Sequence, residues 1–412
     1  MFIKEQIAII REDNELKSEY ESASTIYEYE NASTICMDDT YDSDYSSIGS
    51  SYSTESENEK TINQMKTFFK HDFKFDSQDL KNYPALENIN KIIFPENKSD
   101  IINFNSDLFE NEFKEVETLG SGKFVVKSYI YKNQKMAIKF THIPHSRHTT
   151  NDDNMRKLIE LVREIIKIQK LSRCPNIVIC YGVCLYDGQA LICMEQMDMS
   201  LRNVFEKVHQ LGNRNMFHEE KLLAFVAVAI VDALVYCNEA KMIHRDVKPD
   251  NILLNKNGEI KLCDFGESRI LQDSLSSTFA GSLCYWPPER FDIEKSKYDT
   301  CPDIWGLGIT LVEIVSGSVP YKDKRGRMPQ NIILLQNLIL QLDTPKLVKE
   351  TFQEDSFSNV TREFVQLCLN RVPDRPKYSK LQETAFYKQY GVIKNKDRNE
   401  KVAELLNSFE LV

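Results

Sequence analysis

The chain has 412 residues, and 42% of them are hydrophobic, which is enough for a sizeable core. This length predicts one large folded unit with appended segments. The net charge of −10 comes from residues 1–60, which hold 4 Lys and Arg against 15 Asp and Glu; the rest of the chain holds 48 against 47. A nearly neutral body with an acidic tail argues against nucleic acid as the main partner, since phosphate binding needs a basic surface.

The cysteines and the apolar runs indicate a cellular location. Ten cysteines occur without CxxC spacing, which predicts reduced thiols in the cytoplasm, with the nucleus as the alternative. Residues 1–10 lack the apolar core of a secretory leader. The most apolar run, at 222–231, is shorter than the roughly 20 residues of a membrane span. We therefore interpret it as a buried helix and expect no membrane anchor.

Composition divides the chain into four segments. Residues 1–60 are rich in Ser, Thr, Tyr, Asp and Glu, and we expect them to be disordered because they bury too little apolar surface. Residues 61–112 alternate aromatic islands with polar stretches, so they form either a flank that docks on the body or a linker with binding motifs. We expect the folded domain at 113–387 and an amphipathic helix within 388–412.

Hydrophobic periodicity predicts the elements of the domain in chain order. Strands are expected at 113–119, 125–131, 136–140, 177–186 and 190–194, with a helix at 158–171 between the third and fourth. After residue 200 the pattern becomes mostly helical. A sheet-rich part followed by a helix-rich part predicts an α+β fold with two lobes, a small sheet-rich N-lobe and a larger helical C-lobe.

The stretch 244–251, His-Arg-Asp-Val-Lys-Pro-Asp-Asn, places three chemical groups at fixed offsets. Asp246 can accept the proton of an attacking hydroxyl, Lys248 can sit beside a γ-phosphate, and Asn251 can bind a metal ion. Phosphoryl transfer needs these parts, because the protein mainly holds the triphosphate, neutralises its charge and aligns the acceptor. A lone His-Arg-Asp is more often a surface triplet, but the complete string indicates a catalytic loop.

A second motif, Asp264-Phe265-Gly266, begins thirteen residues after Asn251. Between them, two short apolar runs flank the turn signal Asn257-Gly258, which predicts a hairpin. The hairpin would bring Asp264 back beside Asn251. Both side chains offer oxygen ligands of the kind that Mg²⁺ prefers, so the sequence predicts a magnesium site here.

Two further motifs point to nucleotide binding. Lys139, which ends Met-Ala-Ile-Lys at 136–139, has the pattern of a strand lysine that contacts the α- and β-phosphates. Its expected ion-pair partner is Glu164 on the predicted helix, with Glu160 one turn earlier as the alternative. A phosphate-covering loop is predicted at the residues Leu119, Gly120, Ser121 and Gly122.

The phosphate-covering loop departs from the G-x-G-x-x-G pattern at Val125, which stands in place of the third glycine. Two residues later, Lys127 occupies the position where a valine usually packs on adenine. If the chain slips by one residue, Val126 takes that role. Two glycines still allow a close approach of the backbone to phosphates.

With these motifs in place, residues 113–387 resemble a eukaryotic protein kinase domain. The resemblance implies ATP and Mg²⁺ as cofactors. It also assigns roles to five more residues: Met194 as gatekeeper, Met197 at the adenine edge, Asp303 as a brace for the catalytic loop, and Glu289 paired with Arg375.

The segment after Asp264 narrows the resemblance. Lys248 and Ser282 are typical of kinases that phosphorylate serine or threonine. Ser274 and Thr278 stand four residues apart, and this pair, together with the segment 192–201, is similar to mitogen-activated protein (MAP) kinase kinases. That family implies activation by phosphorylation of the pair and dual specificity for Thr and Tyr of a downstream MAP kinase. The alternative interpretation is a Ser/Thr-rich flexible loop whose spacing is accidental.

The resemblance also implies a docking site for an upstream MAP kinase kinase kinase, which we place at 397–412. Asp397 and Glu400 are expected to form a capping box, with an apolar face made of Val402, Leu405, Leu406 and Phe409. The alternative is a terminal helix that packs on its own domain.

Two rival functions stay open from the sequence. One is a serine/threonine kinase with an unrelated substrate. The other is a scaffold, or pseudokinase, that binds partners without turnover; its best support is Val125.

Overall fold

The computed structural model describes residues 104–121, 125–142, 171–187, 189–212, 220–265, 282–291, 301–322, 327–329 and 331–409. All of them belong to one compact unit, residues 54–412. The expected acidic tail at 1–60 and the flank at 61–103 therefore lie outside the described residues. So does the helix expected at 158–171, apart from Leu171, which is buried.

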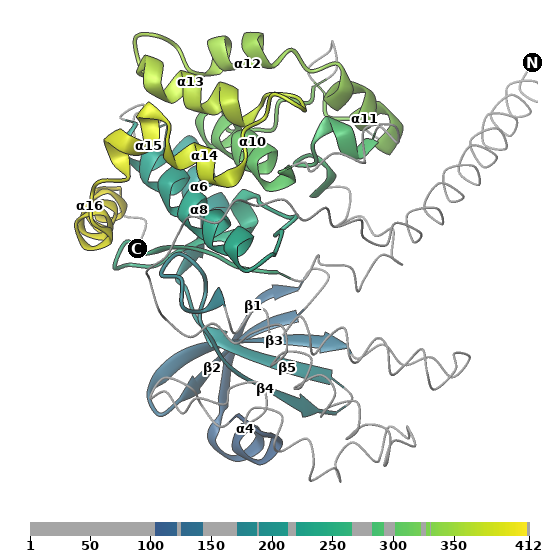
Figure 1. The fold of residues 1–412 in the computed structure, drawn as a ribbon. Helices are drawn as coiled ribbons and strands as arrows, with labels where there is room; N and C mark the ends of the chain where they lie inside the picture. The colour runs from purple at the N-terminus through teal and green to yellow at the C-terminus, as the bar shows by residue number, and fades with distance from the viewer. Residues whose placement is uncertain are drawn as a thin grey trace, which may run out of the picture. The chain divides into compact units, whose positions relative to one another are not determined.

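The N-lobe is a five-stranded antiparallel sheet in the order β1-β2-β3-β5-β4 (Figure 1). Successive side chains along each strand point to opposite faces of this sheet. The strands are β1 (Lys114–Ser121), β2 (Val125–Tyr131), β3 (Gln134–His142), β4 (Cys180–Tyr186) and β5 (Gln189–Glu195). The expected two-lobed α+β fold is confirmed, and the strand expected at 125–131 matches β2 at both ends.

The strand expected at 177–186 is wrong in its first three residues. β4 begins at Cys180, and the preceding residues instead run along β8 (Ile260–Leu262). Ile177 forms a parallel bridge with Leu262, and the Val178 amide donates to the Leu262 carbonyl at 3.0 Å. Residues 177–179 would show the same apolar pattern as part of β4 or alongside β8, because either sheet would bury their apolar side chains.

A short helix, α4 (Ser106–Glu112), precedes the sheet and packs on one of its faces. Asn105 caps the helix by accepting from the Leu108 amide at 2.8 Å. Phe104, Phe109 and Phe113 are buried in one cluster with residues of β2, β3 and β5. The described end of the 61–112 segment, residues 104–112, therefore packs on the sheet. The aromatic islands on which the two interpretations of this segment rest lie outside the described residues.

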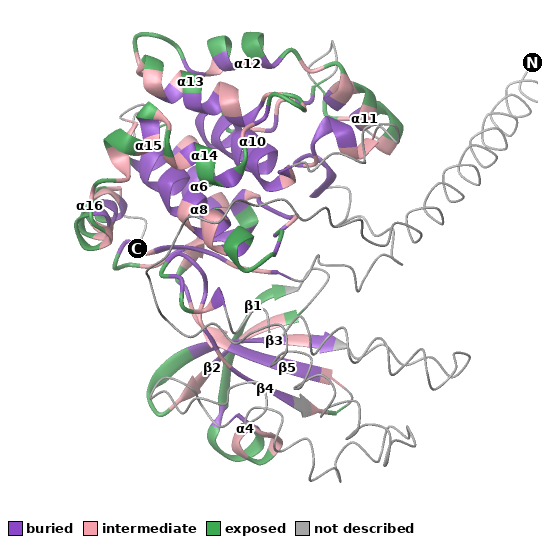
Figure 2. Ribbon diagram, in the orientation of Figure 1, coloured by how far each residue is buried: buried purple, intermediate pink, exposed green. Residues whose placement is uncertain are grey.

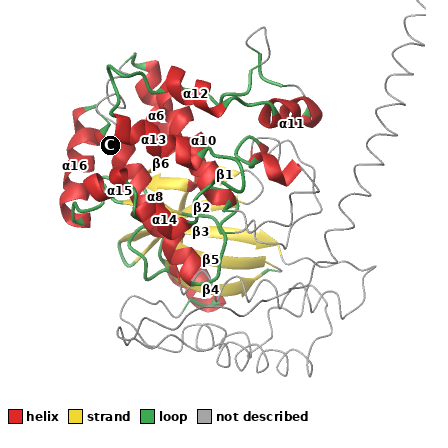
Figure 3. Ribbon diagram, turned by 45° about the horizontal axis from the view of Figure 1, so that its top comes forward, coloured by secondary structure: helices red, strands yellow, loops and turns green. Residues whose placement is uncertain are grey.

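The C-lobe consists mainly of helices, as Figures 1 and 3 show. They are α6 (Leu201–Gln210), α8 (Lys221–Glu239), α10 (Pro302–Ser316), α11 (Ile332–Leu340), α12 (Thr344–Thr351), α13 (Asn359–Cys368), α14 (Tyr378–Gln382), α15 (Ala385–Tyr390) and α16 (Asn395–Ser408). Two short 3-10 turns, η4 (Pro249–Asn251) and η5 (Pro288–Phe291), complete it.

Helix α8 contains the apolar run at 222–231 and lies at the centre of the C-lobe. It is long and apolar enough to cross a membrane by length and composition, but 72% of its apolar window is buried inside the protein. It contacts β8, α10 and α14, and Figure 2 shows most of α8 and α10 in the colour of buried residues. The expected buried helix is confirmed.

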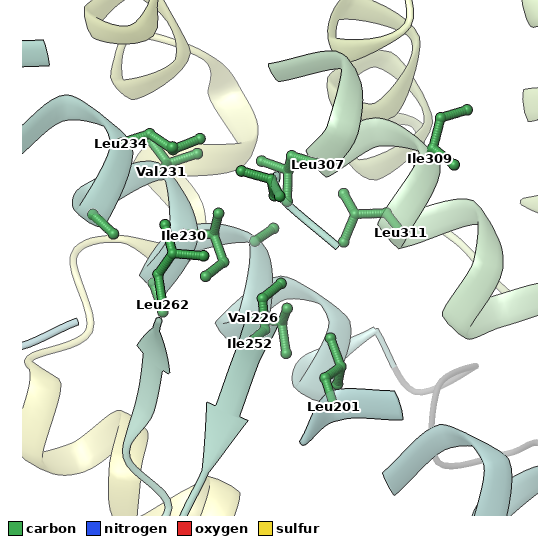
Figure 4. Close-up of a cluster of buried hydrophobic side chains, with 14 of the residues drawn as sticks. Leu201, Val226, Ile230, Val231, Leu234, Ile252, Leu262, Leu307, Ile309 and Leu311 are labelled. Carbon is green, nitrogen blue, oxygen red and sulfur yellow. The ribbon is translucent and has the colours of Figure 1, made fainter. Parts of the chain in front are cut away.

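The predicted hairpin is present as β7 (Ile252–Leu254) and β8, and it is anchored on α8. Gly258 turns the chain between them with φ of 76°, a left-handed conformation that favours glycine. Ile252 and Leu262 point from the two strands toward Val226 and Ile230 of α8 (Figure 4). This packing fixes the residues at both ends of the hairpin, Asn251 and Asp264. A third strand, β6 (Met199–Ser200), pairs with β7.

The C-terminal helix α16 packs against α8, and its apolar face is covered by the domain itself. Val402 and Leu406 are fully buried. The expected capping box is wrong, because the helix begins at Asn395, with Lys394 as its N-cap, and Asp397 lies within the first turn. The backbone of α16 approaches the hairpin turn so closely that a Cβ on Gly258 would lie 2.0 Å from the Asn399 carbonyl oxygen.

Candidate active site

Asp303, in the first turn of α10, fixes the backbone of the catalytic loop. Its carboxylate accepts from the amides of His244 at 2.9 Å and Arg245 at 2.6 Å. Tyr378 donates its hydroxyl to the same carboxylate at 3.1 Å. Asp303 is only 2% exposed, so its buried carboxylate depends on these three donors for its hydrogen bonds. The expected brace is present, and Tyr378 is a contributor that the motif analysis missed.

The carboxylate of Asp246 is held at one oxygen. Its Oδ2 accepts from Lys248 Nζ at 2.6 Å and from Asn251 Nδ2 at 2.8 Å. Its Oδ1 is buried and has no hydrogen-bond partner among the described residues. A buried polar oxygen without a donor is costly, and its position suits it to accept a hydroxyl proton.

Lys248 connects the catalytic aspartate to the segment that begins at Ser282. Its Nζ lies 2.6 Å from Asp246 Oδ2 and 2.6 Å from Ser282 Oγ. The ammonium has three donors and no acceptor, so it can hold both oxygens at once. Ser282 therefore contacts the catalytic loop through Lys248.

The hairpin brings Asn251 and Asp264 together. The Cys263 amide donates to the Asn251 carbonyl at 2.9 Å, one residue before Asp264. Asn251 donates its side-chain nitrogen to the backbone and carboxylate of Asp246, which turns its amide oxygen away from that residue. One carboxylate and one amide oxygen are a donor set that fits Mg²⁺, because this ion commonly takes few protein ligands and keeps waters.

The charge of Asp264 is controlled by Lys139, whose Nζ donates directly to its carboxylate. Burial alone would raise the pKa of Asp264, but the Lys139 charge and hydrogen bond outweigh it, with help from His244 and Lys248, and lower the pKa to about 2. The carboxylate is consequently ionised at neutral pH, as a metal ligand must be.

The strand register settles which residues share the face of Lys139. Val126 lies directly opposite Lys139 across the β2–β3 pair, and Met194 lies opposite Ala137 across β3–β5. Directly opposite residues point to the same face of a sheet. Val126 therefore lies on the Lys139 side. Lys127 is on the other face, where its Nζ bonds Glu115 at 3.0 Å, so the interpretation with the one-residue slip fits the structure.

The same register places Val125 away from this face. Its cross-strand partner is Phe140, which packs against the aromatic cluster on the opposite side of the sheet. In β1, Gly120 is not required for packing, because a Cβ there would meet no atom within 4 Å among the described residues. Leu119 is exposed and Ser121 ends β1.

The segment between the lobes carries Met197, which is buried, and an ion pair that sequence analysis missed. Glu195 at the end of β5 accepts from Lys261 Nζ at 2.8 Å with each carboxylate oxygen, and from the Ile179 amide at 2.7 Å. Lys261 is only 4% exposed. A lysine inside the apolar strand β8 was the available signal, since buried lysines are almost always paired.

The expected pair of Glu289 and Arg375 is confirmed. The guanidinium donates to both carboxylate oxygens, at 2.5 and 3.1 Å, and its Nε donates to the Asn370 carbonyl at 2.9 Å. Both side chains are at most 2% exposed. This bidentate pair attaches the segment 282–291 to the C-lobe.

Five residues of the predicted site lie outside the described residues: Gly122, Glu160, Glu164, Ser274 and Thr278. Their assigned roles stay predictions. The residues that the structure does bring together around the catalytic loop are Lys139, Asp246, Lys248, Asn251, Asp264 and Ser282.

Comparisons with known proteins agree with this geometry. Residues 113–387 match the protein kinase domain family. The chain is 34% identical to dual specificity mitogen-activated protein kinase kinase jkk-1 of Caenorhabditis elegans over 285 residues, 68% of this chain and 62% of the relative. It is 34% identical to sek-1 of the same organism over 281 residues (66% and 78%). It is 33% identical to dual specificity mitogen-activated protein kinase kinase 7 of Homo sapiens over 291 residues (69% and 65%). The chain therefore belongs to the protein kinase family, and within it to the mitogen-activated protein kinase kinases.

Proposed function

We propose that the protein transfers the γ-phosphate of ATP to Thr and Tyr in the activation loop of a downstream MAP kinase. The observation that carries the reaction class is the carboxylate of Asp246, with one oxygen held by Lys248 and Asn251 and the other without a described donor. The substrate class rests on the names of the relatives, which are dual-specificity MAP kinase kinases.

Each residue has a part in this reaction. Asp246 accepts the proton of the attacking hydroxyl at Oδ1, and Lys248 holds the carboxylate in place through Oδ2. Asn251 and Asp264 would hold Mg²⁺, which neutralises charge on the transferred group. Lys139 would contact the α- and β-phosphates.

The adenine would lie on the Lys139 face of the sheet. Val126, Met194 and the backbone of Met197 are the groups we assign to it, and the loop from Leu119 to Gly122 would cover the phosphates. The side chain of Val125 points to the opposite face, which weakens the main argument for a pseudokinase.

We further propose that phosphorylation of Ser274 and Thr278 by an upstream kinase activates the enzyme in the cytoplasm. A phosphate adds about −1.5 to −2 charge and can order a loop by pairing with an arginine. Arg245 is the receiver we assign, because it precedes the catalytic base. The docking site proposed at 397–412 would have to use the outer face of α16, since Val402 and Leu406 are buried.

The test uses the purified full-length chain and a panel of catalytically dead MAP kinases. Mass spectrometry should find paired Thr and Tyr phosphorylation on one member, and Asp246→Asn should abolish it. Phosphorylation of Ser or Thr alone, on substrates outside the panel, would favour a kinase with another substrate. Absence of any turnover, including after treatment with upstream kinases, would favour a scaffold. Full activity of Ser274→Ala/Thr278→Ala would refute the activation mechanism.

A further inference from the structure

A partly buried polar cluster beside the catalytic loop takes no part in the chemistry described above. Arg202, in the first turn of α6, reaches three other elements. Its Nε lies 2.8 Å from Asp250 Oδ1, its Nη2 lies 2.8 Å from the Tyr285 hydroxyl, and its Nη1 lies 3.2 Å from Glu313 Oε1. We call these four residues the Arg202 clasp.

The clasp reaches from the surface into the domain, because the side chain of Asp250 is 45% exposed and that of Arg202 is 27% exposed. The Tyr285 hydroxyl donates to the second oxygen of Glu313 at 2.5 Å. The side chain of Glu313 is only 5% exposed, and Tyr285 is buried as well. Arg202 satisfies three acceptors at once because its planar guanidinium presents five donors in a fixed fork. Such a network holds its members in one arrangement, since loss of Arg202 would take a partner from the buried groups Tyr285 and Glu313.

The clasp joins the catalytic loop to the segment that begins at Ser282. These two segments meet at Lys248, beside the carboxylate that would receive the proton of the acceptor hydroxyl. Asp250 lies in the turn η4, between Lys248 and Asn251 of the catalytic loop. Tyr285 closes a turn with Ser282, because its amide donates to the Ser282 carbonyl at 3.1 Å. Ser282 in turn contacts Lys248. Arg202 therefore holds the catalytic loop with one nitrogen and the segment that begins at Ser282 with another.

Both segments pack against helix α10. A Cβ on Gly306 would lie 2.8 Å from the Val247 carbonyl oxygen and 3.7 Å from that of Tyr285. The catalytic loop and the segment after Ser282 thus both lie against this glycine. Glu313, from the same helix, then fixes Tyr285 and Arg202 further along.

We propose that Arg202 is a positioning residue for the protein substrate. It sets the distance between the segment 282–287 and the catalytic loop, so that the acceptor hydroxyl meets Asp246. This inference rests on the proposed kinase function, because it concerns the alignment of a protein hydroxyl with that carboxylate. Arg202 touches neither the reacting atoms nor the Lys139 face of the sheet, so its effect should be confined to the protein substrate.

The first test compares Arg202→Ala with the wild-type full-length chain in steady-state kinetics, with myelin basic protein as a general substrate. We expect kcat/KM for the protein to fall about tenfold or more and KM for ATP to change less than about twofold, as expected for loss of a charged hydrogen-bond network. Arg202→Lys should resemble Ala, since a lysine keeps the charge but not the fork. Lys207→Ala, which removes an exposed charge from the same helix, is the matched control and should change neither value.

The second test measures amide hydrogen exchange, which needs no substrate. Exchange in 282–287 should quicken in Arg202→Ala and in Tyr285→Phe, while exchange in α8 stays as in wild type. Equal losses for ATP and protein, with faster exchange throughout, would show a merely structural residue and overturn the proposal. Unchanged exchange and kinetics would also overturn it. If wild type phosphorylates no MAP kinase, the proposed substrate class fails, but both measurements on the clasp still stand.

Discussion

The pair of Glu289 and Arg375 allows a quantitative prediction, because both partners are almost completely buried. Arg375→Met removes the cation and keeps most of the apolar volume beside Trp305, over which the guanidinium lies at 5.2 Å. The carboxylate of Glu289 then remains buried without its partner. Breaking a buried ion pair on one side costs about 3–5 kcal/mol. At about 2 °C per kcal/mol for a domain of this size, the melting temperature should fall by about 6–10 °C.

Urea unfolding and thermal unfolding of the full-length chain measure this loss. Arg362→Met is the matched control, because Arg362 pairs with Glu354 at 2.7 Å but that carboxylate is 76% exposed, and such pairs contribute about 0–1 kcal/mol. The double variant Glu289→Gln/Arg375→Met should recover part of the stability, since no charge is left buried. The reasoning is refuted if Arg375→Met costs less than its control, or if the double variant is no more stable than the single one.

Three further predictions concern residues that hold the site in place. Asp303→Ala should lower the free energy of unfolding by about 3 kcal/mol, because two loop amides lose their acceptor; a urea midpoint equal to wild type would contradict this. Ser282→Ala should lower kcat about tenfold with little change in stability, since Lys248 loses one of its two partners; unchanged kcat in steady-state assays would argue against that contact. Gly258→Ala should destabilise the domain by more than about 1 kcal/mol, because the residue has a left-handed φ and no room beside Asn399; an unchanged melting temperature would exclude this close packing.

The elements that the sequence predicted best are those whose pattern is local. The alternation at 125–131 marks β2 to the residue, because each side chain reports only which face of the sheet it occupies. The Asn257-Gly258 signal likewise predicts the hairpin, because the left-handed φ of Gly258 is a property of one residue. The buried helix α8 is predicted by its continuous apolar run, because a helix that is apolar on all sides must be buried in the core.

The errors arise where tertiary contacts decide between equivalent local choices. Ile177 has strand character in either sheet, and its pairing with Leu262 depends on how the lobes join. Asp397 and Glu400 have capping-box spacing, but the helix starts two residues before Asp397, at Asn395, where Arg398 can reach Asp232 of α8 at 3.5 Å. Periodicity within one segment contains no information about either partner.

The candidate site divides in the same way. Asp246, Asn251 and Asp264 are found by spacing, because short fixed offsets carry their chemistry. Lys261 and Arg202 were missed, since their partners lie 66 and 111 residues away in the sequence. In a sequence, a buried charged residue is visible only as a charge within an apolar segment. The residue that neutralises it can be identified only from the folded structure.

The departure at Val125 shows how a fold can alter the meaning of a motif. Read as a string, a valine in place of the third glycine suggests a damaged phosphate loop and supports a scaffold. In the β2–β3 pair, however, its side chain lies with Phe140 on the face opposite Lys139. The substitution therefore costs the loop some backbone freedom but places no bulk against a nucleotide on the Lys139 face. Because Val126 is the residue that faces Lys139, the sheet keeps an apolar contact there, and the sequence departure is compatible with a working enzyme.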